Sequence, residues 1–357
     1  MTWLVTGAAG FIGSNLVRYL REVRPEQQLV SFDALTYAGN PENLADLKGD
    51  PRHSFVKGDV RDVAHLERVF EEHGITGVFH LAAESHVDRS IVGPMAFVET
   101  NVSGTAALLH CARRAWEGRD DVRFLHVSTD EVFGSLGPVG AFDEETAYDP
   151  RSPYSASKAA SDHLVRAWGH TYGLPVLITN CTNNYGPYQF PEKLIPVVIT
   201  RAVEEREVPI YGDGLQVRDW LHVGDHCRAL LDVFERGVAG ETYCVGGEAE
   251  STNLSLVHAL LDAVDGTLGR TVGCSRSLIR HVTDRPGHDR RYAMDIGKIR
   301  RELGWSPSVD LATGLEQTVR WYLENEGWVA RAKSGEARAF ESLWYEGRGD
   351  HDDEGAR

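Results

Sequence analysis

The chain has 357 residues, enough for one large domain or two of ordinary size, and its 42% hydrophobic and 25% charged residues are typical of a globular protein. Its 37 basic and 53 acidic residues give a formal net charge of -16, which argues against nucleic acid or an anionic membrane as a partner. No apolar run approaches the roughly 18 residues of a membrane span, and no signal-peptide pattern opens the chain, so we expect a cytoplasmic protein. No C-x-x-C pair is formed by the five cysteines, Cys111, Cys181, Cys227, Cys244 and Cys274. We therefore expect reduced thiols and no metal site.

Short β-branched apolar runs alternate with longer helical patterns through the first half of the chain. The predicted strands are Trp3–Val5, Leu29–Phe32, Ser54–Val56, Gly77–Leu81, Arg123–Val127 and Val176–Thr179. The predicted helices between them are Ile12–Val23, Val63–Glu72, Phe97–Ala115 and Ala156–Tyr172. This alternation predicts an α/β fold with a Rossmann-type, doubly wound parallel sheet.

The alternation loosens after about residue 185, where glycine and proline residues interrupt the chain. Helical segments are predicted near 193–206, 224–236 and 254–264. We expect residues 1–185, with returning segments near 224–250, to bind a cofactor. Residues 186–345 should form a smaller, mostly helical part that binds the substrate. The polar, glycine-rich tail 346–357 is predicted to be disordered.

A glycine-rich loop follows the first predicted strand. Gly7, Gly10 and Gly13 have the spacing G-x-x-G-x-x-G, with Phe11 and Ile12 between the last two, and a helix follows. Glycines at these positions permit a tight turn and let backbone N–H groups approach a pyrophosphate at the helix N-terminus. The loop therefore predicts a dinucleotide site.

Asp33 ends the second predicted strand, 20 residues after Gly13. A carboxylate there can accept hydrogen bonds from both ribose hydroxyls and would repel a 2′-phosphate, which favours NAD over NADP. Asp59 and Val60 end the third strand and are predicted to contact the adenine.

Tyr154 and Lys158 are four residues apart at the start of a predicted helix and so share one face. A nearby ammonium stabilises a phenolate, so we expect the pKa of Tyr154 to be lowered toward that of a usable general base. Such a base removes the proton of an alcohol while a nicotinamide accepts the hydride.

Together, the glycine loop and the Tyr154-x-x-x-Lys158 motif resemble those of the extended short-chain dehydrogenase/reductases that modify nucleotide sugars. That family includes 4-epimerases, decarboxylases and 4,6-dehydratases. All of them begin by oxidising the sugar at C4, so these two motifs leave the alternatives open.

Asp130 and Glu131 separate the alternatives. They follow the predicted strand Arg123–Val127, at the end of the sheet where α/β proteins bind ligands. Two adjacent carboxyl groups should have different pKa values, giving a proton donor beside an acceptor. Elimination of water across C5–C6 requires such a pair, whereas epimerases typically carry small polar residues at the position of Asp130.

The resemblance is therefore most specific to the dTDP-glucose 4,6-dehydratases and extends from Trp3 to about Tyr322. The matching stretches are Asp33–Asn40, Leu81–Arg89, Thr179–Pro187, Arg218–Trp220 and Asp284–His288. It implies that Tyr154, Lys158 and Thr129 serve C4 oxidation, that Glu131 removes the C5 proton and that Asp130 protonates O6. Hydride then returns to C6, giving a 4-keto-6-deoxy sugar.

The same resemblance assigns binding roles. The expected NAD-binding residues are Gly7, Gly10, Phe11, Ile12, Gly13, Asp33, Ala34, Leu35, Thr36, Asp59, Val60, Leu81, Ala82, Ala83, Ser85, Thr100, Tyr154, Lys158 and Asn184. The expected dTDP-glucose-binding residues are Ser85, Thr129, Asn183, Lys193, Leu194, Pro209, Ile210, Tyr211, Arg218, Asn253, Asp284, Arg285, Pro286, Gly287 and His288. Arg218 and Arg285 suit a diphosphate because a guanidinium donates fork-shaped hydrogen bonds.

The family also implies a homodimer, joined here through helices at about 95–116 and 154–172. Trp3 and Phe133 depart from the smaller or hydroxylated residues common in relatives, and the connection from Glu131 to Tyr154 is short. Three alternatives remain open at this stage: UDP- or CDP-glucose as the substrate, a 4-epimerase or decarboxylase, and a non-catalytic NAD-binding regulator.

Overall fold

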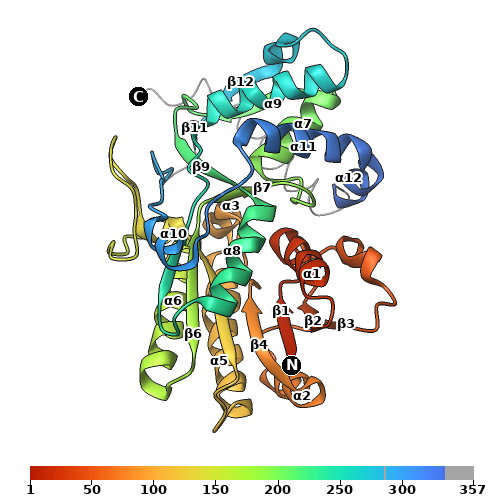
Figure 1. Cartoon of the computed structure of the whole chain (residues 1–357). Helices are drawn as coiled ribbons and strands as arrows, with labels where there is room; N and C mark the ends of the chain where they lie inside the picture. Colours follow the sequence, from red (N-terminus) through yellow and green to blue (C-terminus); the bar gives the residue numbers. More distant parts are fainter. Residues whose placement is uncertain (285–286, 334–357) are drawn as a thin grey trace.

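A seven-stranded sheet forms the centre of the computed structural model, which describes residues 1–284 and 287–333 (Figure 1). The strand order is β10-β6-β5-β4-β1-β2-β3, and every neighbouring pair is parallel. The bounds are β1 Thr2–Thr6, β2 Gln28–Asp33, β3 His53–Lys57, β4 Ile75–His80, β5 Arg123–Thr129, β6 Val176–Cys181 and β10 Thr242–Val245. The predicted doubly wound parallel sheet is confirmed, and β10 is a seventh strand that was not predicted.

Helices cover both faces of this sheet. Helices α1 (Phe11–Val23) and α8 (Val223–Arg236) pack together on one face. Helices α2, α5 and α6 pack side by side on the other, with bounds Val63–His73, Gly104–Ala115 and Pro153–Tyr172. The strands are apolar on both sides because each face meets a helix layer.

Strand β1 shows how the two hydrophobic cores form. Trp3 and Val5 lie in the core beneath α1 and α8, whereas Leu4 points into the core beneath α2 and α5. Trp3 packs against the ring of Phe234 with centroids 5.0 Å apart. A Cβ on Gly77 would lie 2.7 Å from the Trp3 ring, so this glycine makes room for the indole.

The predicted helix Phe97–Ala115 is not one regular helix. A short helix α4 (Pro94–Phe97) is followed by a π-helical segment, Val98–Ser103, and then by α5. Asn101 is buried within the π-helical segment, where its side chain bonds both backbone groups of Glu84 and its carbonyl accepts the hydroxyls of Thr105 and Ser161. These long-range hydrogen bonds explain the departure, which hydrophobic periodicity alone does not reveal.

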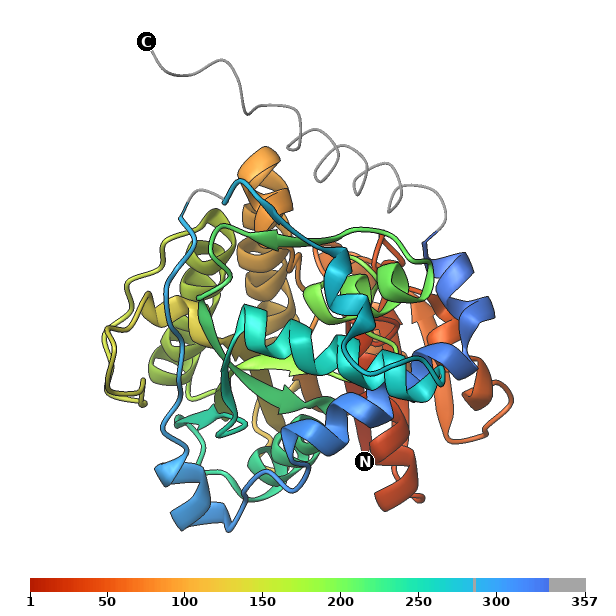
Figure 2. The same cartoon turned by 90° about the horizontal axis from the view of Figure 1, so that it is seen from above.

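The smaller part of the molecule lies beyond the carboxyl ends of the parallel strands, at the top of Figure 1. Its helices α7, α9, α11 and α12 have the bounds Leu194–Val203, Asn253–Thr267, Leu311–Glu324 and Glu326–Ala332, and they share a third hydrophobic core. Figure 2 looks onto this end, where α9 and α11 cross in front of the sheet. The prediction of mostly helical structure holds, but two small sheets are added.

One small sheet has the order β11-β9-β7 and the other pairs β12 with β8. Their bounds are β7 Asn183–Tyr185, β8 Val208–Tyr211, β9 Val217–His222, β11 Glu250–Thr252 and β12 Ile279–Val282. Strands of three to six residues leave too short a pattern to recognise in the sequence.

None of the helices in the described ranges has both the length and the apolar character that crossing a membrane requires. The predicted disordered tail 346–357 lies outside the described residues.

Candidate active site

The glycine loop connects β1 to α1 and closes tightly. Gly7 has a φ of +68°, and a Cβ there would lie 2.8 Å from the backbone nitrogen of Ala82. A Cβ on Gly13 would lie only 2.1 Å from the Gly7 carbonyl oxygen. Because neither position has room for a side chain, the loop backbone and the first turn of α1 lie open to the cavity described below.

Asp33, at the end of β2, secures this loop. One of its carboxylate oxygens accepts the N–H of Ala9 at 2.9 Å and the other accepts the N–H of Leu35 at 2.8 Å. Burial raises the pKa of Asp33, and the two backbone hydrogen bonds oppose that rise. Each oxygen keeps a further lone pair, so the carboxylate can still accept from a ribose hydroxyl.

A cavity of about 440 Å³ runs from the glycine loop to the amino-terminal end of α6. Every predicted NAD-binding residue lines it except Leu35, whose backbone N–H instead bonds Asp33. Thr129, Asp130, Glu131, Asn183 and Lys193 line the same cavity. The structure therefore brings the predicted cofactor and catalytic residues together on one continuous wall.

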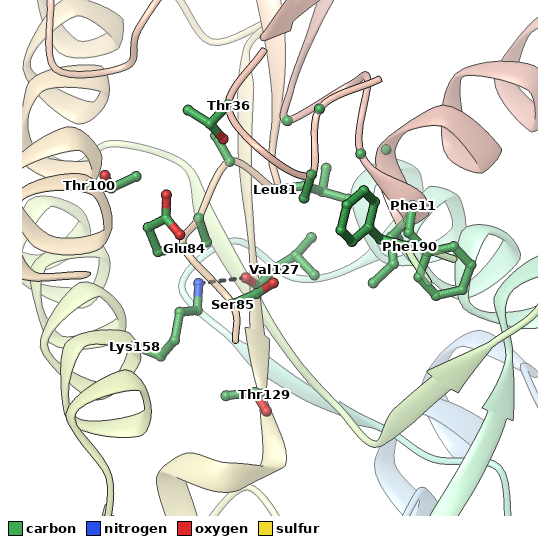
Figure 3. Close-up of a pocket in the computed structure, with 18 of the residues that line it drawn as sticks. Phe11, Thr36, Leu81, Glu84, Ser85, Thr100, Val127, Thr129, Lys158 and Phe190 are labelled. Atoms are coloured by element: carbon green, nitrogen blue, oxygen red, sulfur yellow. Dashed lines mark hydrogen bonds between the residues drawn. The ribbon is translucent and has the colours of Figure 1, made fainter. Parts of the chain in front are cut away.

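Helix α6 places Tyr154 and Lys158 on this wall. Ser152 and Ser155 form a capping box that starts the helix, and Pro153 occupies its first turn. Lys158 is buried, and its Nζ donates to the carbonyl oxygen of Val127 at 2.9 Å (Figure 3). Burial lowers the pKa of Lys158 to about 8.

The expectation of a lowered pKa for Tyr154 is wrong for the protein alone. Burial raises the pKa of Tyr154 well above 10, and the negative charge of Glu131 raises it further. A hydrogen bond with Thr129 opposes this rise. The sequence pattern pairs Tyr154 with a cation but does not reveal the effect of the Glu131 carboxylate, which comes from the turn after β5.

Asp130 and Glu131 follow β5 in a 3₁₀ turn, Asp130–Phe133. The backbone N–H of Glu131 bonds the Thr129 hydroxyl, which in turn donates to Asp130 Oδ1 at 3.2 Å. Asp130 is 2% exposed, and its Oδ2 has no hydrogen-bond partner among the described residues. Burial raises the pKa of Asp130 well above its usual value, and the charge of half-buried Glu131 adds to the rise. Asp130 is therefore a neutral acid beside a more exposed carboxyl group.

The remaining predicted substrate residues that the structure describes lie outside the lining of this cavity, in the smaller part of the molecule. Leu194 begins α7, Asn253 begins α9, and Pro209, Ile210 and Tyr211 belong to β8. Arg285 and Pro286 lie outside the described residues.

Long-range hydrogen bonds connect this second group. The hydroxyl of Tyr211 bonds Asp88 at 3.2 Å, and Asp284 accepts from Gln216 at 2.9 Å and contacts the His288 ring at 2.6 Å. Gly287, next to His288, has a φ of +67°.

Arg218, in β9, is buried over the ring of Tyr292, 4.1 Å from its centroid. Its guanidinium donates to the carbonyl oxygens of Val217 and Asp289 at 2.8 and 2.9 Å. These contacts hold the Arg218 guanidinium in a fixed position. Its positive charge opposes the rise in the pKa of Asp130. Arg218 thus lies near the carboxyl group of Asp130, although Asp130 lies 88 positions earlier in the chain.

Two acidic residues that sequence reasoning did not single out also line the cavity, Glu84 and Glu192. Burial raises the pKa of both carboxyl groups. Arg89 lies 3.3 Å from Glu192 and stacks 3.9 Å from the centroid of the Tyr37 ring. Glu84 falls inside the matching stretch Leu81–Arg89, which is a usable signal, whereas Glu192 belongs to no recognised motif.

Comparison with known proteins agrees with this geometry. The chain matches the family described as GDP-mannose 4,6 dehydratase over residues 4–318. It is 57% identical to a dTDP-glucose 4,6-dehydratase of Xanthomonas campestris pv. campestris, covering 94% of this chain and 97% of that protein. A dTDP-glucose 4,6-dehydratase of Salmonella typhimurium is 51% identical over 98% of this chain and all of its own length.

Among solved structures, DesIV, a dTDP-glucose 4,6-dehydratase from Streptomyces venezuelae with NAD and TYD bound, superposes with a TM-score of 0.86. It is 50% identical, and the match covers 93% of this chain and all of DesIV. The identities and coverages far exceed what a shared fold alone produces. The chain therefore belongs to the dTDP-glucose 4,6-dehydratase family.

Proposed function

We propose that this protein is an NAD-dependent dTDP-glucose 4,6-dehydratase, a hydro-lyase that forms dTDP-4-keto-6-deoxyglucose. The observation that carries the proposal is the placement of Asp130 and Glu131 beside Tyr154 on a cavity that begins at the glycine loop. An oxidoreductase of one alcohol requires only the tyrosine and the lysine. The two carboxyl groups supply the additional proton transfers of an elimination.

The cavity suits NAD. The crowding at Gly7 and Gly13 leaves the loop backbone as the surface for a pyrophosphate, and Asp33 at the end of β2 suits a ribose diol. When bound, NAD supplies the acceptor for the C4 hydride and returns that hydride to C6.

The protein's own groups carry the protons. The Lys158 ammonium stabilises the phenolate form of Tyr154, and this phenolate, aided by Thr129, takes the proton of the C4 hydroxyl and becomes a neutral phenol. The new C4 ketone acidifies the C5 proton, which Glu131 removes, and a proton returns to C5 when the hydride reaches C6. Asp130, held neutral by burial, protonates O6 as water leaves.

The second group of residues supports the proposal that the substrate carries a pyrimidine nucleoside diphosphate. Tyr211 in β8 offers an aromatic ring and a hydroxyl for a pyrimidine, and Arg218 in β9 offers a fixed guanidinium for a diphosphate. The relatives named above act on dTDP-glucose, which favours dTDP over UDP or CDP.

The experiment is a side-by-side assay of dTDP-, UDP- and CDP-glucose with the NAD-loaded protein. We expect a base-sensitive 4-keto chromophore, the highest kcat/KM with dTDP-glucose and no net formation of NADH. Steady accumulation of NADH, or recovery of dTDP-galactose alone, would contradict the proposal.

The assembly and organisation remain predictions. We propose a homodimer joined through the segments near 95–116 and 154–172, supported by the exposed apolar side chains Ile91, Val92, Met95 and Val98 on elements that pack against α6. Analytical ultracentrifugation tests this assembly. The division into a cofactor part (1–185 with 224–250) and a nucleotide-sugar part (186–345) is supported by α8 and β10 packing with the parallel sheet. A cytoplasmic location also stays a prediction.

A further inference from the structure

Helix α6 carries a third polar side chain behind the two that face the cavity. Tyr154, Lys158 and Asp162 are spaced four residues apart, so they lie on one face of the helix. Asp162 is 0% exposed and Lys158 is 4% exposed. A fully buried carboxyl group is costly unless it is paired and hydrogen-bonded, so its surroundings require an explanation.

Groups from several elements hold the Asp162 carboxylate. Its Oδ2 accepts from the Ser128 hydroxyl at 2.9 Å, the Tyr148 hydroxyl at 2.8 Å and the Asn180 amide at 3.3 Å. Its Oδ1 lies 3.1 Å from His126 Nε2. Burial raises the pKa of Asp162, but the hydrogen bond from His126 and the positive charge of Lys158 outweigh it and leave the pKa lowered. Asp162 is therefore an anion inside the protein.

His126 does not carry the balancing positive charge. Burial and the positive charge of Lys158 lower its pKa to about 4, so the ring is neutral. Its Nε2 lies 3.1 Å from Asp162 Oδ1 and 3.3 Å from Lys158 Nζ. The neutral ring thus lies between the Asp162 carboxylate and the Lys158 ammonium without balancing the negative charge.

The balancing charge is on Lys158. Its Nζ donates to Val127 O and lies 3.3 Å from His126 Nε2, on the same side of β5 as Asp162. Burial lowers the pKa of Lys158, and the charge of Asp162 is the larger of two influences that raise it, the other being Cys181. Further groups face the pair: Arg166 from α6 reaches the Tyr148 hydroxyl, and His80 from β4 lies against the His126 ring.

We propose that Asp162 is a positioning residue for catalysis, whose buried negative charge keeps Lys158 an ammonium. The inference rests on the proposed function, in which that ammonium stabilises the Tyr154 phenolate. Asp162 acts through Lys158 and touches neither the cavity nor the substrate. If the Asp162 carboxylate served only as a hydrogen-bond acceptor, its removal would leave the titration of the Tyr154–Lys158 pair unchanged.

The first test is the pH dependence of kcat for Asp162→Asn with dTDP-glucose. Loss of a negative charge favours deprotonation of Lys158, so the pH–kcat profile should move to lower pH by roughly one unit. At about pH 8, kcat should fall roughly fivefold, with little change in KM. The proposal would be overturned if kcat of Asp162→Asn rose and fell at the same pH values as in the wild-type protein, or if kcat were lowered by the same factor at every pH.

Tyr148→Phe is the matched control. It removes a hydrogen bond to the same carboxylate oxygen but keeps the charge, so its profile should keep the limbs of the wild-type protein. A shift in this variant as large as that of Asp162→Asn would assign the effect to the hydrogen-bond network. It would contradict the proposal that the negative charge of Asp162 causes the shift.

A second test needs no activity and decides the pairing even if the wild-type protein converts no dTDP-glucose. Lys158→Met leaves the Asp162 carboxylate buried without its cation, so adding Asp162→Asn to Lys158→Met should raise the urea midpoint. In the wild-type background the same substitution should lower the midpoint or prevent folding. An equal loss in both backgrounds would show that the two charges are not coupled.

Discussion

The cofactor side and the substrate side of this protein are built in different ways. On the cofactor side, the seven residues Gly7–Gly13 are contiguous in the chain, and one carboxylate, Asp33, accepts the backbone N–H of Ala9 within them. On the substrate side, Tyr211 and Arg218 come from different strands, and partners far away in the chain hold them. A local segment encodes the first site, whereas the second exists only once distant strands are in register.

The largest expected effect is a loss of kcat on substitution of Asp130, which lies between the cofactor side and the substrate side. Asp130→Asn removes the proposed acid while keeping its size, so kcat should fall roughly 10²- to 10³-fold, as is typical for loss of a general acid. C4 oxidation should survive, and single-turnover absorbance should show NADH that forms and persists. Unchanged turnover would instead indicate a reaction without elimination and break the assignment.

A substitution in the glycine loop should act on the cofactor alone. The Cβ of Gly13→Ala would collide with the Gly7 carbonyl, so the loop must open, and NAD affinity should fall at least about tenfold because the backbone no longer fits a pyrophosphate. Calorimetric titration with NAD measures this.

Gly266→Ala is the control on the substrate side, since a Cβ there meets nothing within 4 Å inside α9. It should leave NAD affinity unchanged and stabilise the helix slightly. Equal losses of NAD affinity in the two variants would mean that the loop is not a separate local site.

The complementary change on the substrate side is Arg218→Lys. A lysine keeps the charge but loses the fork that bridges the Val217 and Asp289 carbonyls, so KM for dTDP-glucose should rise roughly tenfold. NAD affinity should stay the same, and kcat should change less than KM. A fall in kcat at constant KM would place Arg218 in the chemistry rather than in binding.

The smallest expected effect concerns how the two sides are joined. Asp225, in α8, accepts the backbone N–H groups of Ser308 and Val309, which lead into α11. Burial raises the pKa of Asp225, but hydrogen bonds from Ser308 and Arg228 outweigh it, and the pKa is lowered.

A carboxylate with a lowered folded-state pKa stabilises the protein above its unfolded pKa, and this contribution is lost as pH falls through the folded value. Asp225→Asn should therefore lower the urea midpoint at neutral pH, and the difference from wild type should shrink by about pH 3. A difference that stays constant with pH would exclude the charge as its source.

The sequence predicted some parts of the site better than others, for physical reasons. The glycine loop, Asp33 and the Tyr154–Lys158 pair were predicted from spacing, because a turn or a helix fixes the geometry of neighbouring residues. Asp162 was not singled out, although it continues the same spacing along α6. A polar residue on a helix is usually exposed, and only packing against β5 and β6 buries this one.

By itself, the sequence predicted the parallel sheet from the alternation of strand and helix patterns, and it predicted the cofactor loop and the adjacent carboxyl groups from residues a few positions apart. The tertiary structure determined how deeply those groups are buried and which charged groups lie near them. It interrupted the helix predicted at Phe97–Ala115 and raised the pKa values of Asp130 and Tyr154. It also placed Arg218 near Asp130 and an anion behind Lys158. Burial and charge–charge interactions depend on distances in space, which the order of residues along the chain does not contain.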